Sequence, residues 1–318
     1  MTDIKRLGLG CMSMNRKNRD AAIRTVHAAL DAGITLFNTG EFYQCGESEM
    51  ILGEALKNTP RDKFFVSVKF GVMAAPDGRI YGADVNPFNV KSHLACSLKR
   101  LGLDYVDLYE PARMDLAYPV EEIVGAMADL VKEGYIRHIG LTEISEDTLR
   151  RGFAVHPVHT VELRYSLAER KYEKDLFPAA SSLGVNVLAF GALAHGLLND
   201  AMLEGKGNTT IPVRLFAPEN LPGNLERVRA LKEVAASKNT TVSRLALAWV
   251  FAKQPAASVL VGTANPDHLA DSVVALGLNL TENDLAEIER AFPAESVLGG
   301  GMPDFVCRNG KPVMGGAD

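Results

Sequence analysis

Two short segments near the start of the chain contain a tyrosine and a lysine that could act together. The first is Phe37-Asn-Thr-Gly-Glu-Phe-Tyr43 and the second is Ser67-Val-Lys-Phe-Gly71. Each follows an apolar run that predicts a buried strand. A free phenol has a pKa of about 10, and an ammonium at hydrogen-bond distance favours the phenolate and lowers that value. We therefore predict that Tyr43 is a general acid, which protonates a carbonyl oxygen as hydride reaches the carbon, and that Lys69 tunes it.

Each of these residues also has a purely structural interpretation. Lys69 continues the apolar run 64–68, so its stem is expected to be buried. A buried ammonium needs a partner, or its pKa falls. A lone lysine in this place could instead extend to the rim with its stem buried. Tyr43 alone would be interpreted as a core or rim aromatic residue. The catalytic hypothesis therefore depends on the two side chains meeting.

The elements that would position these residues alternate between short apolar strands and amphipathic helices. The predicted strands are 7–11, 34–37, 64–68, 105–109, 136–141, 160–163, 185–190 and 257–261. The predicted helices are 20–32, 47–57, 89–100, 120–132, 145–153, 173–183, 225–237, 242–251 and 266–275. Eight strand–helix units predict a closed (β/α)8 TIM barrel with long loops on its active face and a C-terminal tail, formed as a single domain over residues 1–318. An open dinucleotide-binding sheet would show Gly-x-Gly-x-x-Gly after its first strand, and the third glycine is missing here.

In a barrel of this kind, polar residues at the carboxyl ends of the strands form the site. The residues at those ends are Asn38, Tyr43, Lys69, Ala112, Arg113, Asp115, Thr142, Glu143, Glu162, Arg164, Phe190, Gly262 and Thr263. The long loop 191–222 contains His195 and belongs on the same face, where it would cover the site. The Gly- and Pro-rich tail from residue 292 either folds over the barrel mouth or is mobile, and the sequence does not decide between these.

Composition excludes several classes of function. The chain has 318 residues, of which 47% are hydrophobic, and a formal net charge of −5 without a basic run, so we expect no nucleic-acid partner. No apolar stretch reaches about 18 residues and the first six are not a signal segment, so we expect no membrane partner. Four scattered cysteines predict free thiols in the cytoplasm. The histidines show no metal-binding pattern. We expect a monomer or a small homo-oligomer that acts on a small molecule.

Several motifs occur together in one order along the chain. They are Leu7-Gly-Leu-Gly-Cys-Met12, the two segments above, Leu98-Lys-Arg-Leu-Gly-Leu-Asp-Tyr-Val-Asp-Leu-Tyr109, Ile136-Arg-His-Ile-Gly-Leu141 and Gly196-Leu-Leu198. From about residue 6 to about residue 290 the chain resembles the aldo-keto reductases. The resemblance implies a (β/α)8 barrel that binds NADPH extended across its mouth. It also implies hydride transfer to a small-molecule carbonyl substrate, or the reverse reaction.

The family's catalytic set is Asp, Tyr, Lys and His, and by motif these fall on Asn38, Tyr43, Lys69 and Ala112. Only the second and third are kept. Asn38 can still accept a hydrogen bond from the ammonium, but it cancels no charge. Ala112 binds nothing, so Arg113 or Glu143 is the candidate to replace the histidine. Arg113 is also our candidate for contacting the substrate, as is His195 in the long loop.

Some motif variants narrow the resemblance. Phe-Asn-x-Gly-Glu-Phe-Tyr, the segment from Pro111 to Asp115 and Val161-Glu-x-x-Tyr-Ser-Leu167 are similar to those of fungal pyridoxal reductases, which reduce the aldehyde of pyridoxal. Pyridoxal has a phenolic hydroxyl beside its aldehyde. This hydroxyl could partly polarise the carbonyl and relax the need for a histidine.

The resemblance also assigns a cofactor site that departs from the family pattern. Thr142, Glu143 and Glu162 stand where Ser-Asn and Gln hold the nicotinamide amide, and Phe190 stands where a tyrosine stacks on the ring. Gly262, Thr263 and His268 match the segment that grips the adenosine 2′-phosphate, with Asp271 by the adenine. The usual Lys or Arg is replaced by Ala264 and Asn265. A site without fixed positive charge discriminates a phosphate poorly. We therefore expect NADPH and leave NADH open.

Three functional hypotheses follow from these residues. The first is NADPH-dependent aldehyde reduction. The second keeps catalysis but makes the protein an NAD-dependent alcohol or sugar dehydrogenase. The third is a weakly active nucleotide-binding regulatory or sensor protein, because half of the catalytic set is replaced.

Overall fold

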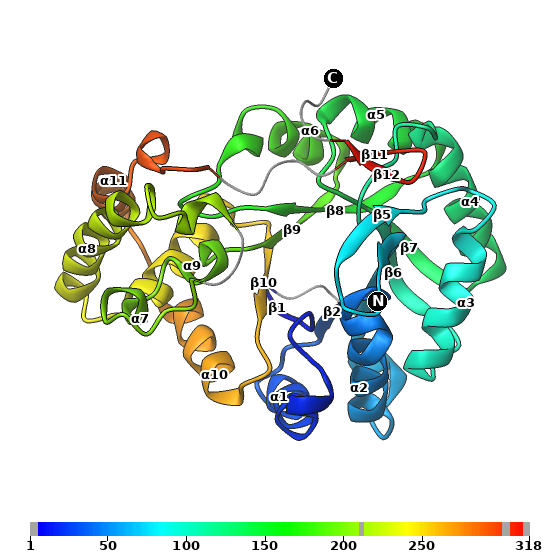
Figure 1. The fold of residues 1–318 in the computed structure, drawn as a ribbon, viewed down its shortest axis with the longest axis horizontal. Coiled ribbons are helices and arrows are strands. Elements are labelled where there is room, and N and C mark those ends of the chain that lie inside the picture. The colour runs from blue at the N-terminus through cyan, green and yellow to red at the C-terminus, as the bar shows by residue number, and fades with distance from the viewer. Residues whose placement is uncertain (1–5, 210–212, 301–305, 314–318) are drawn as a thin grey trace.

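Eight parallel strands close into a barrel in the computed structural model, which describes residues 6–209, 213–300 and 306–313. Around the barrel the order is β1-β10-β9-β8-β7-β6-β3-β2 (Figure 1). The strands are β1 (Leu7–Gly10), β2 (Leu36–Gly40), β3 (Phe65–Phe70), β6 (Val106–Pro111), β7 (Ile136–Thr142), β8 (Val158–Arg164), β9 (Asn186–Phe190) and β10 (Ser258–Gly262). The predicted (β/α)8 barrel is confirmed.

Helices surround the barrel, and their bounds follow capping and stop residues in the sequence (Figure 1). They are α1 (Arg19–Asp31), α2 (Glu47–Leu56), α3 (Val90–Leu101), α4 (Val120–Glu133), α5 (Glu146–Val155), α6 (Leu176–Leu183), α7 (Asp200–Leu203), α8 (Leu221–Ser237), α9 (Val242–Lys253), α10 (Pro266–Val274) and α11 (Glu282–Ala291). Gly102, Gly134 and Gly184 end α3, α4 and α6 in the left-handed conformation that favours glycine. The sequence analysis missed α7 and α11.

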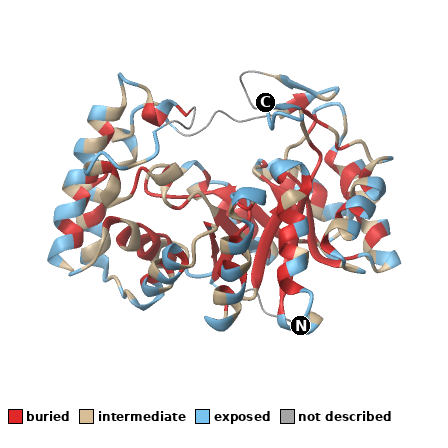
Figure 2. Ribbon diagram, turned by 60° about the horizontal axis from the view of Figure 1, so that its bottom comes forward, coloured by how far each residue is buried: buried red, intermediate tan, exposed pale blue. Residues whose placement is uncertain are grey.

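The hydrophobic core has two parts. The larger lies between the strands and the helices, and Figure 2 shows the buried strands inside an exposed outer layer. The smaller fills the barrel interior with Leu36, Phe65, Leu108, Leu188 and Leu260. A Cβ at Gly8 would lie 2.8 Å from Leu36 and 2.9 Å from Leu260, closer than real contacts allow. The sequence therefore needs glycine at that point on β1. Among the described residues, no helix is long and apolar enough to cross a lipid bilayer.

Two strand boundaries differ from the prediction, and both differences concern the site. We expected β2 to cover 34–37, but it runs from Leu36 to Gly40. Likewise β3 continues to Phe70, beyond the expected end at residue 68. Polar side chains near the ends of these strands hid their true length. The parallel register pairs Asn38 with Ser67 and Gly40 with Lys69. Asn38 and Lys69 therefore lie on rigid strands rather than on loops.

Two antiparallel hairpins were not predicted. One joins β4 (Val72–Ala74) to β5 (Ile80–Ala83) after the third barrel strand. The other joins β11 (Val306–Arg308) to β12 (Lys311–Val313) in the C-terminal tail, and it lies beside β5 (Figure 1). The long loop 191–222 contains α7 and the first residues of α8, and residues 210–212 lie outside the described part.

The C-terminal hairpin is attached to the loop that follows β6. The amide of Leu116 donates to the carbonyl of Cys307 at 2.7 Å, and the amide of Cys307 donates to Met114 at 3.1 Å. The buried carboxylate of Asp115 accepts from the amides of Asn309 at 3.0 Å and Gly310 at 2.5 Å. This part of the tail therefore folds onto the active face, next to the predicted substrate residues.

We predict that Asp115→Ala releases this hairpin without unfolding the barrel. A hydrogen bond to a charged group contributes about 1.5–3 kcal/mol, and the substitution removes two such bonds to the hairpin. Amide hydrogen exchange at residues 306–310 should accelerate at least about tenfold, while exchange in β6 stays unchanged. Unchanged protection of the hairpin would contradict this account. Asp77→Ala, in the exposed turn between β4 and β5, is the control.

Candidate active site

A buried lysine lies between an amide and a carboxylate inside the barrel mouth. Lys69 Nζ on β3 lies 2.5 Å from Asn38 Oδ1 on β2 and 2.6 Å from Glu162 Oε1 on β8. The Lys69 and Glu162 side chains are 6% and 1% exposed, so water does not screen their attraction. The sequence analysis did not foresee the ion pair with Glu162. The charge that Asn38 lacks comes from the other side of the barrel.

The side-chain amide of Asn38 offers an acceptor to Lys69 and a donor to Glu162. Its Oδ1 accepts from the ammonium, while its Nδ2 donates to Glu162 Oε2 at 2.6 Å and to Ser67 Oγ at 3.1 Å. An aspartate at position 38 has no hydrogen to donate and would oppose the carboxylate of Glu162. Asn38 therefore suits a site in which residue 162 is the acid.

A second acid, Glu110 on β6, lies behind this cluster. Its Oε1 accepts from Ser67 Oγ at 2.7 Å, and Thr142 Oγ1 lies 3.4 Å from Oε2. Burial, and then the charge of Glu162, raises the pKa of Glu110 well above its ordinary value. The raised pKa favours the protonated form of Glu110. The cluster contains one ammonium and two carboxyl groups, and only Glu162 contacts the ammonium directly.

The ammonium of Lys69 is stabilised despite its burial. Burial by itself lowers the pKa of Lys69, but the charge of Glu162 and the hydrogen bond to it raise that pKa above its ordinary value. Lys69 is therefore a fixed positive charge at physiological pH.

Tyr43 lies over this charge at the start of the 3-10 turn η2 (Tyr43–Gly46), directly after β2. The structure brings the predicted pair together, because Lys69 Nζ lies 5.4 Å from the centre of the Tyr43 ring. Our prediction for the pKa of Tyr43 was wrong in direction. Burial raises that pKa above its ordinary value, and the opposing charge of Lys69 offsets the effect only in part. The phenol is therefore fully protonated at pH 7, which is the form that donates a proton.

The two residues proposed to replace the missing histidine contact each other. Arg113 Nη2 lies 3.2 Å from Glu143 Oε2, and the other oxygen of Glu143 pairs with Arg164 Nε at the end of β8. Arg113 also donates to the carbonyl of Ala112 at 2.6 Å, while the Ala112 side chain is buried. Glu143 is therefore engaged by two guanidinium groups. Arg164 was expected at the end of its strand, but its pairing with Glu143 was not predicted.

The candidate substrate residue His195 lies next to Arg164. It belongs to the 3-10 turn η5 (Ala194–Gly196) and lines a small cavity with Arg164, Ser166, Gly191 and Leu215. Burial, and then the charge of Arg164, lowers the pKa of His195. The imidazole is therefore neutral at pH 7, able to donate from one ring nitrogen and accept at the other. Its contact with substrate stays a prediction.

Residues at the ends of β9 and β10 fit parts of a dinucleotide. Phe190 is a half-buried aromatic residue at the end of β9, where it packs against the leucines of the barrel interior. Gly262 is exposed, and a Cβ there would meet nothing within 4 Å, which leaves room beside the start of α10. A helix N-terminus attracts phosphate. Thr263 is buried and accepts from the Asn265 amide, and His268 is exposed on the first turn of α10.

The fit for a 2′-phosphate is weaker. Arg244 on α9 pairs with Asp271 on α10, with its Nη2 at 2.6 Å from Asp271 Oδ1. Thr142 and Glu162, predicted to hold the nicotinamide amide, lie in the Lys69 cluster. These residues therefore fit an aromatic ring and a phosphate chain, and the nearby Arg244 is already paired with Asp271.

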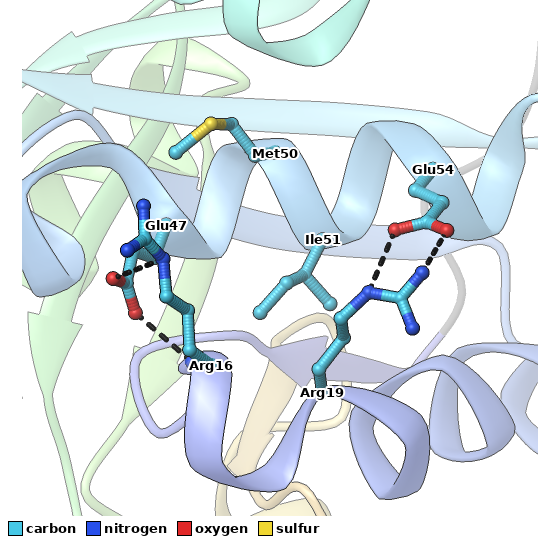
Figure 3. Close-up of a pocket in the computed structure, with 6 residues that line it drawn as sticks. All are labelled: Arg16, Arg19, Glu47, Met50, Ile51 and Glu54. Atoms are coloured by element: carbon cyan, nitrogen blue, oxygen red, sulfur yellow. Dashed lines mark hydrogen bonds and ion pairs between the residues drawn. The ribbon is translucent and has the colours of Figure 1, made fainter.

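A hollow on the outer surface is unrelated to this cluster. It is lined by Arg16, Arg19, Glu47, Met50, Ile51 and Glu54, between the start of α1 and α2 (Figure 3). Arg16 pairs with Glu47 at 3.0 Å, and Arg19 pairs with Glu54. These charges neutralise each other. Within the described ranges, no group of three acidic, histidine or cysteine side chains could hold a metal ion.

We predict that Glu143→Asn destabilises the protein less than Glu143→Gln does. Both changes remove the charge between Arg113 and Arg164. Glu143 has a φ of 49°, a left-handed conformation that asparagine adopts more readily than glutamine. The difference in unfolding free energy should be about 1 kcal/mol, measured by urea denaturation. Equal losses would show that the backbone conformation costs nothing here.

Comparisons with known proteins agree with this architecture. A model of the aldo/keto reductase family matches residues 6–292. "Probable aldo-keto reductase 1" from Glycine max is 34% identical over 313 residues, covering 94% of this chain and 88% of that protein. The glycerol dehydrogenase from Gluconobacter oxydans is 27% identical, with a TM-score of 0.80 over 92% of this chain and 93% of that one. An aldo-keto reductase from Klebsiella pneumoniae in complex with NADPH is 25% identical, with a TM-score of 0.71 over 91% and 92%. The chain therefore belongs to the aldo/keto reductase family of oxidoreductases.

Proposed function

We propose that the protein reduces an aldehyde to its alcohol with NADPH as the hydride donor and Tyr43 as the general acid. One observation carries the proposal: the buried Lys69 ammonium, held by Glu162 and Asn38, lies beside a protonated Tyr43. Membership of the family supports carbonyl reduction, and the NADPH complex of the Klebsiella relative supports the choice of cofactor.

The proposed chemistry requires Tyr43 to deliver a proton and Lys69 to stabilise what remains. NADPH, when bound, supplies a hydride to the carbonyl carbon. The Tyr43 hydroxyl gives its proton to the carbonyl oxygen, and the O–H bond leaves its electron pair on the phenolate. The fixed ammonium of Lys69 favours that phenolate, which later regains a proton from solvent. Burial of Lys69 and Glu162 strengthens this attraction, because little water screens it.

The proposed cofactor contacts use the open surfaces at the barrel mouth. Phe190 offers a ring face to the nicotinamide. Gly262, Thr263 and the start of α10 offer room and backbone amides to the phosphates, with His268 and Asp271 farther along the helix.

Pyridoxal is the proposed substrate on chemical grounds. Ala112 offers no side chain to orient the carbonyl, and Arg113 is engaged with Glu143. A substrate with a hydroxyl beside its aldehyde would polarise its own carbonyl. The buried or unpaired thiols of Cys11, Cys45, Cys96 and Cys307 are in keeping with the proposed cytoplasmic location.

A second candidate function is NAD-dependent oxidation of an alcohol or sugar. Two observations favour it: the likeness to the Gluconobacter glycerol dehydrogenase, and the engagement of Arg244 by Asp271 near the predicted 2′-phosphate position. The ratio of the dissociation constants for NADPH and NADH separates the two candidates. A ratio strongly in favour of NADPH supports the first.

We predict that Tyr43→Phe lowers kcat for aldehyde reduction by about 10²–10⁴-fold, because it removes the proton donor. The dissociation constant for NADPH, from fluorescence titration, should change less than about threefold, a factor worth only some 0.7 kcal/mol. Tyr81→Phe, on the exposed hairpin strand β5, is the matched control. Wild-type turnover by Tyr43→Phe would exclude Tyr43 as the general acid.

The raised pKa of Tyr43 predicts the pH dependence of both directions. Reduction needs the protonated phenol, so kcat should stay flat from about pH 7 to pH 9 and fall as the pH rises through a value above about 10. Oxidation of the alcohol needs the phenolate, so its rate should rise over the same interval. These profiles are measured by NADPH absorbance in both directions. A fall in the reduction rate centred below pH 9 would contradict the burial of the phenol.

A further inference from the structure

We propose that Glu162 is the positioning residue that keeps Lys69 charged and directed at Tyr43. Glu162 takes the role that the resemblance assigns to an acid at position 38. The inference rests on the proposed function, because it concerns the tuning of Tyr43. By the family resemblance, an acid belongs at position 38 on β2 and an amide at position 162 on β8. In this chain the amide is at position 38 and the acid is at position 162.

The geometry shows that the two side chains form one unit. Glu162 uses both oxygens, accepting from Lys69 Nζ with Oε1 and from Asn38 Nδ2 with Oε2, each at 2.6 Å. Asn38 uses both ends of its amide, since Oδ1 accepts from the same ammonium. All three side chains are buried. The lysine ammonium therefore contacts one carboxylate and one amide, and these two groups are hydrogen-bonded to each other.

Such a unit retains its hydrogen bonds when acid and amide change places. With aspartate at 38 and glutamine at 162, the aspartate would accept from the ammonium and from the glutamine NH₂ group, and the glutamine carbonyl would accept from the ammonium. The single changes behave differently. Glu162→Gln leaves a buried ammonium without an adjacent charge. Asn38→Asp puts two carboxylates in contact, because the Nδ2 donor between them is lost.

Other charged or titratable groups near this unit do not replace Glu162. Glu110 accepts from Ser67, and no direct contact joins it to Lys69 Nζ among the described hydrogen bonds. Burial also raises its pKa, which disfavours its charged form. Burial raises the pKa of the Cys11 thiol to about 12, so Cys11 is uncharged at neutral pH. Arg113 is a cation and pairs with Glu143. Glu162 is therefore the one anion in contact with Lys69 in the part of the chain that the structure describes.

The test compares Glu162→Gln, Asn38→Asp and the exchanged double variant Asn38→Asp/Glu162→Gln. We expect Glu162→Gln to lower kcat for aldehyde reduction by about 10²-fold, within the range for lost acid catalysis, with a KM within about threefold of wild type. Its pH profile should change as well, because the Lys69 amine now loses its proton at a lower pH. The double variant should recover kcat to within about tenfold of wild type and restore the pH profile.

Two further variants keep the test decisive. Glu110→Gln makes the same acid-to-amide change in the neighbouring carboxyl group, and its loss of kcat should be much smaller than that of Glu162→Gln. If Glu162→Gln does not fold, Glu162→Asp keeps the charge but shortens the side chain. It should fold and lose kcat while the exchanged double variant stays active.

The outcomes separate this inference from the proposed function. Wild-type kcat and pH profile in Glu162→Gln would overturn the inference. So would a folded, NADPH-binding double variant that is no more active than Glu162→Gln. If Tyr43→Phe is inactive while Glu162→Gln is fully active, only the inference fails. If Tyr43→Phe is fully active, the proposed function fails, whatever the result for Glu162→Gln.

Discussion

A buried ammonium needs a counter-charge, and this requirement connects the two sides of the barrel. Lys69 on β3 meets its anion on β8, and three strands of the closed ring are involved once Asn38 on β2 is included. Removing one partner of a buried ion pair costs about 3–5 kcal/mol, because the other charge is left without compensation. Closure of the barrel therefore does more than bury apolar surface. It brings the carboxylate of Glu162 into contact with Lys69, which allows the buried lysine to remain protonated.

The region around Tyr43 follows from the same constraint. β2 must run to Gly40 to place Asn38 inside the barrel, and the chain then turns sharply through Tyr43. Gln44 and Cys45 adopt left-handed φ values of 50° and 52°, which ordinary residues seldom do. Such strain persists only where the surrounding structure enforces it. We infer that this turn is what holds the phenol over the ammonium.

A second charge cluster completes the mouth. Glu143 lies between Arg113 and Arg164, and the loop carrying Arg113 is the one that Asp115 joins to the C-terminal hairpin. The loop with Arg113 and Asp115 is therefore held on one side by the Glu143 cluster and on the other by the hairpin. This loop lies on the face where the substrate is proposed to bind. Ala112, which by motif stands where the family has a histidine, is buried, and its carbonyl accepts from Arg113.

The sequence was sufficient for the barrel but not for the arrangement of its charges. The alternation of apolar strands with amphipathic helices predicts all eight barrel strands, because each segment's own pattern of apolar residues shows which of its side chains are buried. The pairing of Lys69 with Glu162 spans 93 positions and depends on barrel closure, which no local pattern records. A signal was nevertheless present, since Glu110 and Glu162 are acids at buried positions near the carboxyl ends of their strands. The direction of the Tyr43 pKa was wrong because local motifs do not reveal how deeply a loop residue is buried. The tail hairpin was missed because its partner, Asp115, lies 194 positions away.

The protonation of Lys69 tests the central claim most directly. Nitrogen-15 NMR of the lysine side chains, with Lys69 assigned by substitution, measures its pKa in the intact protein. We expect a pKa above the ordinary value of 10.5 in the wild type, and a clearly lower one in Glu162→Gln. A wild-type Lys69 that loses its proton well below pH 10.5, or one that does not respond to the change at position 162, would contradict it.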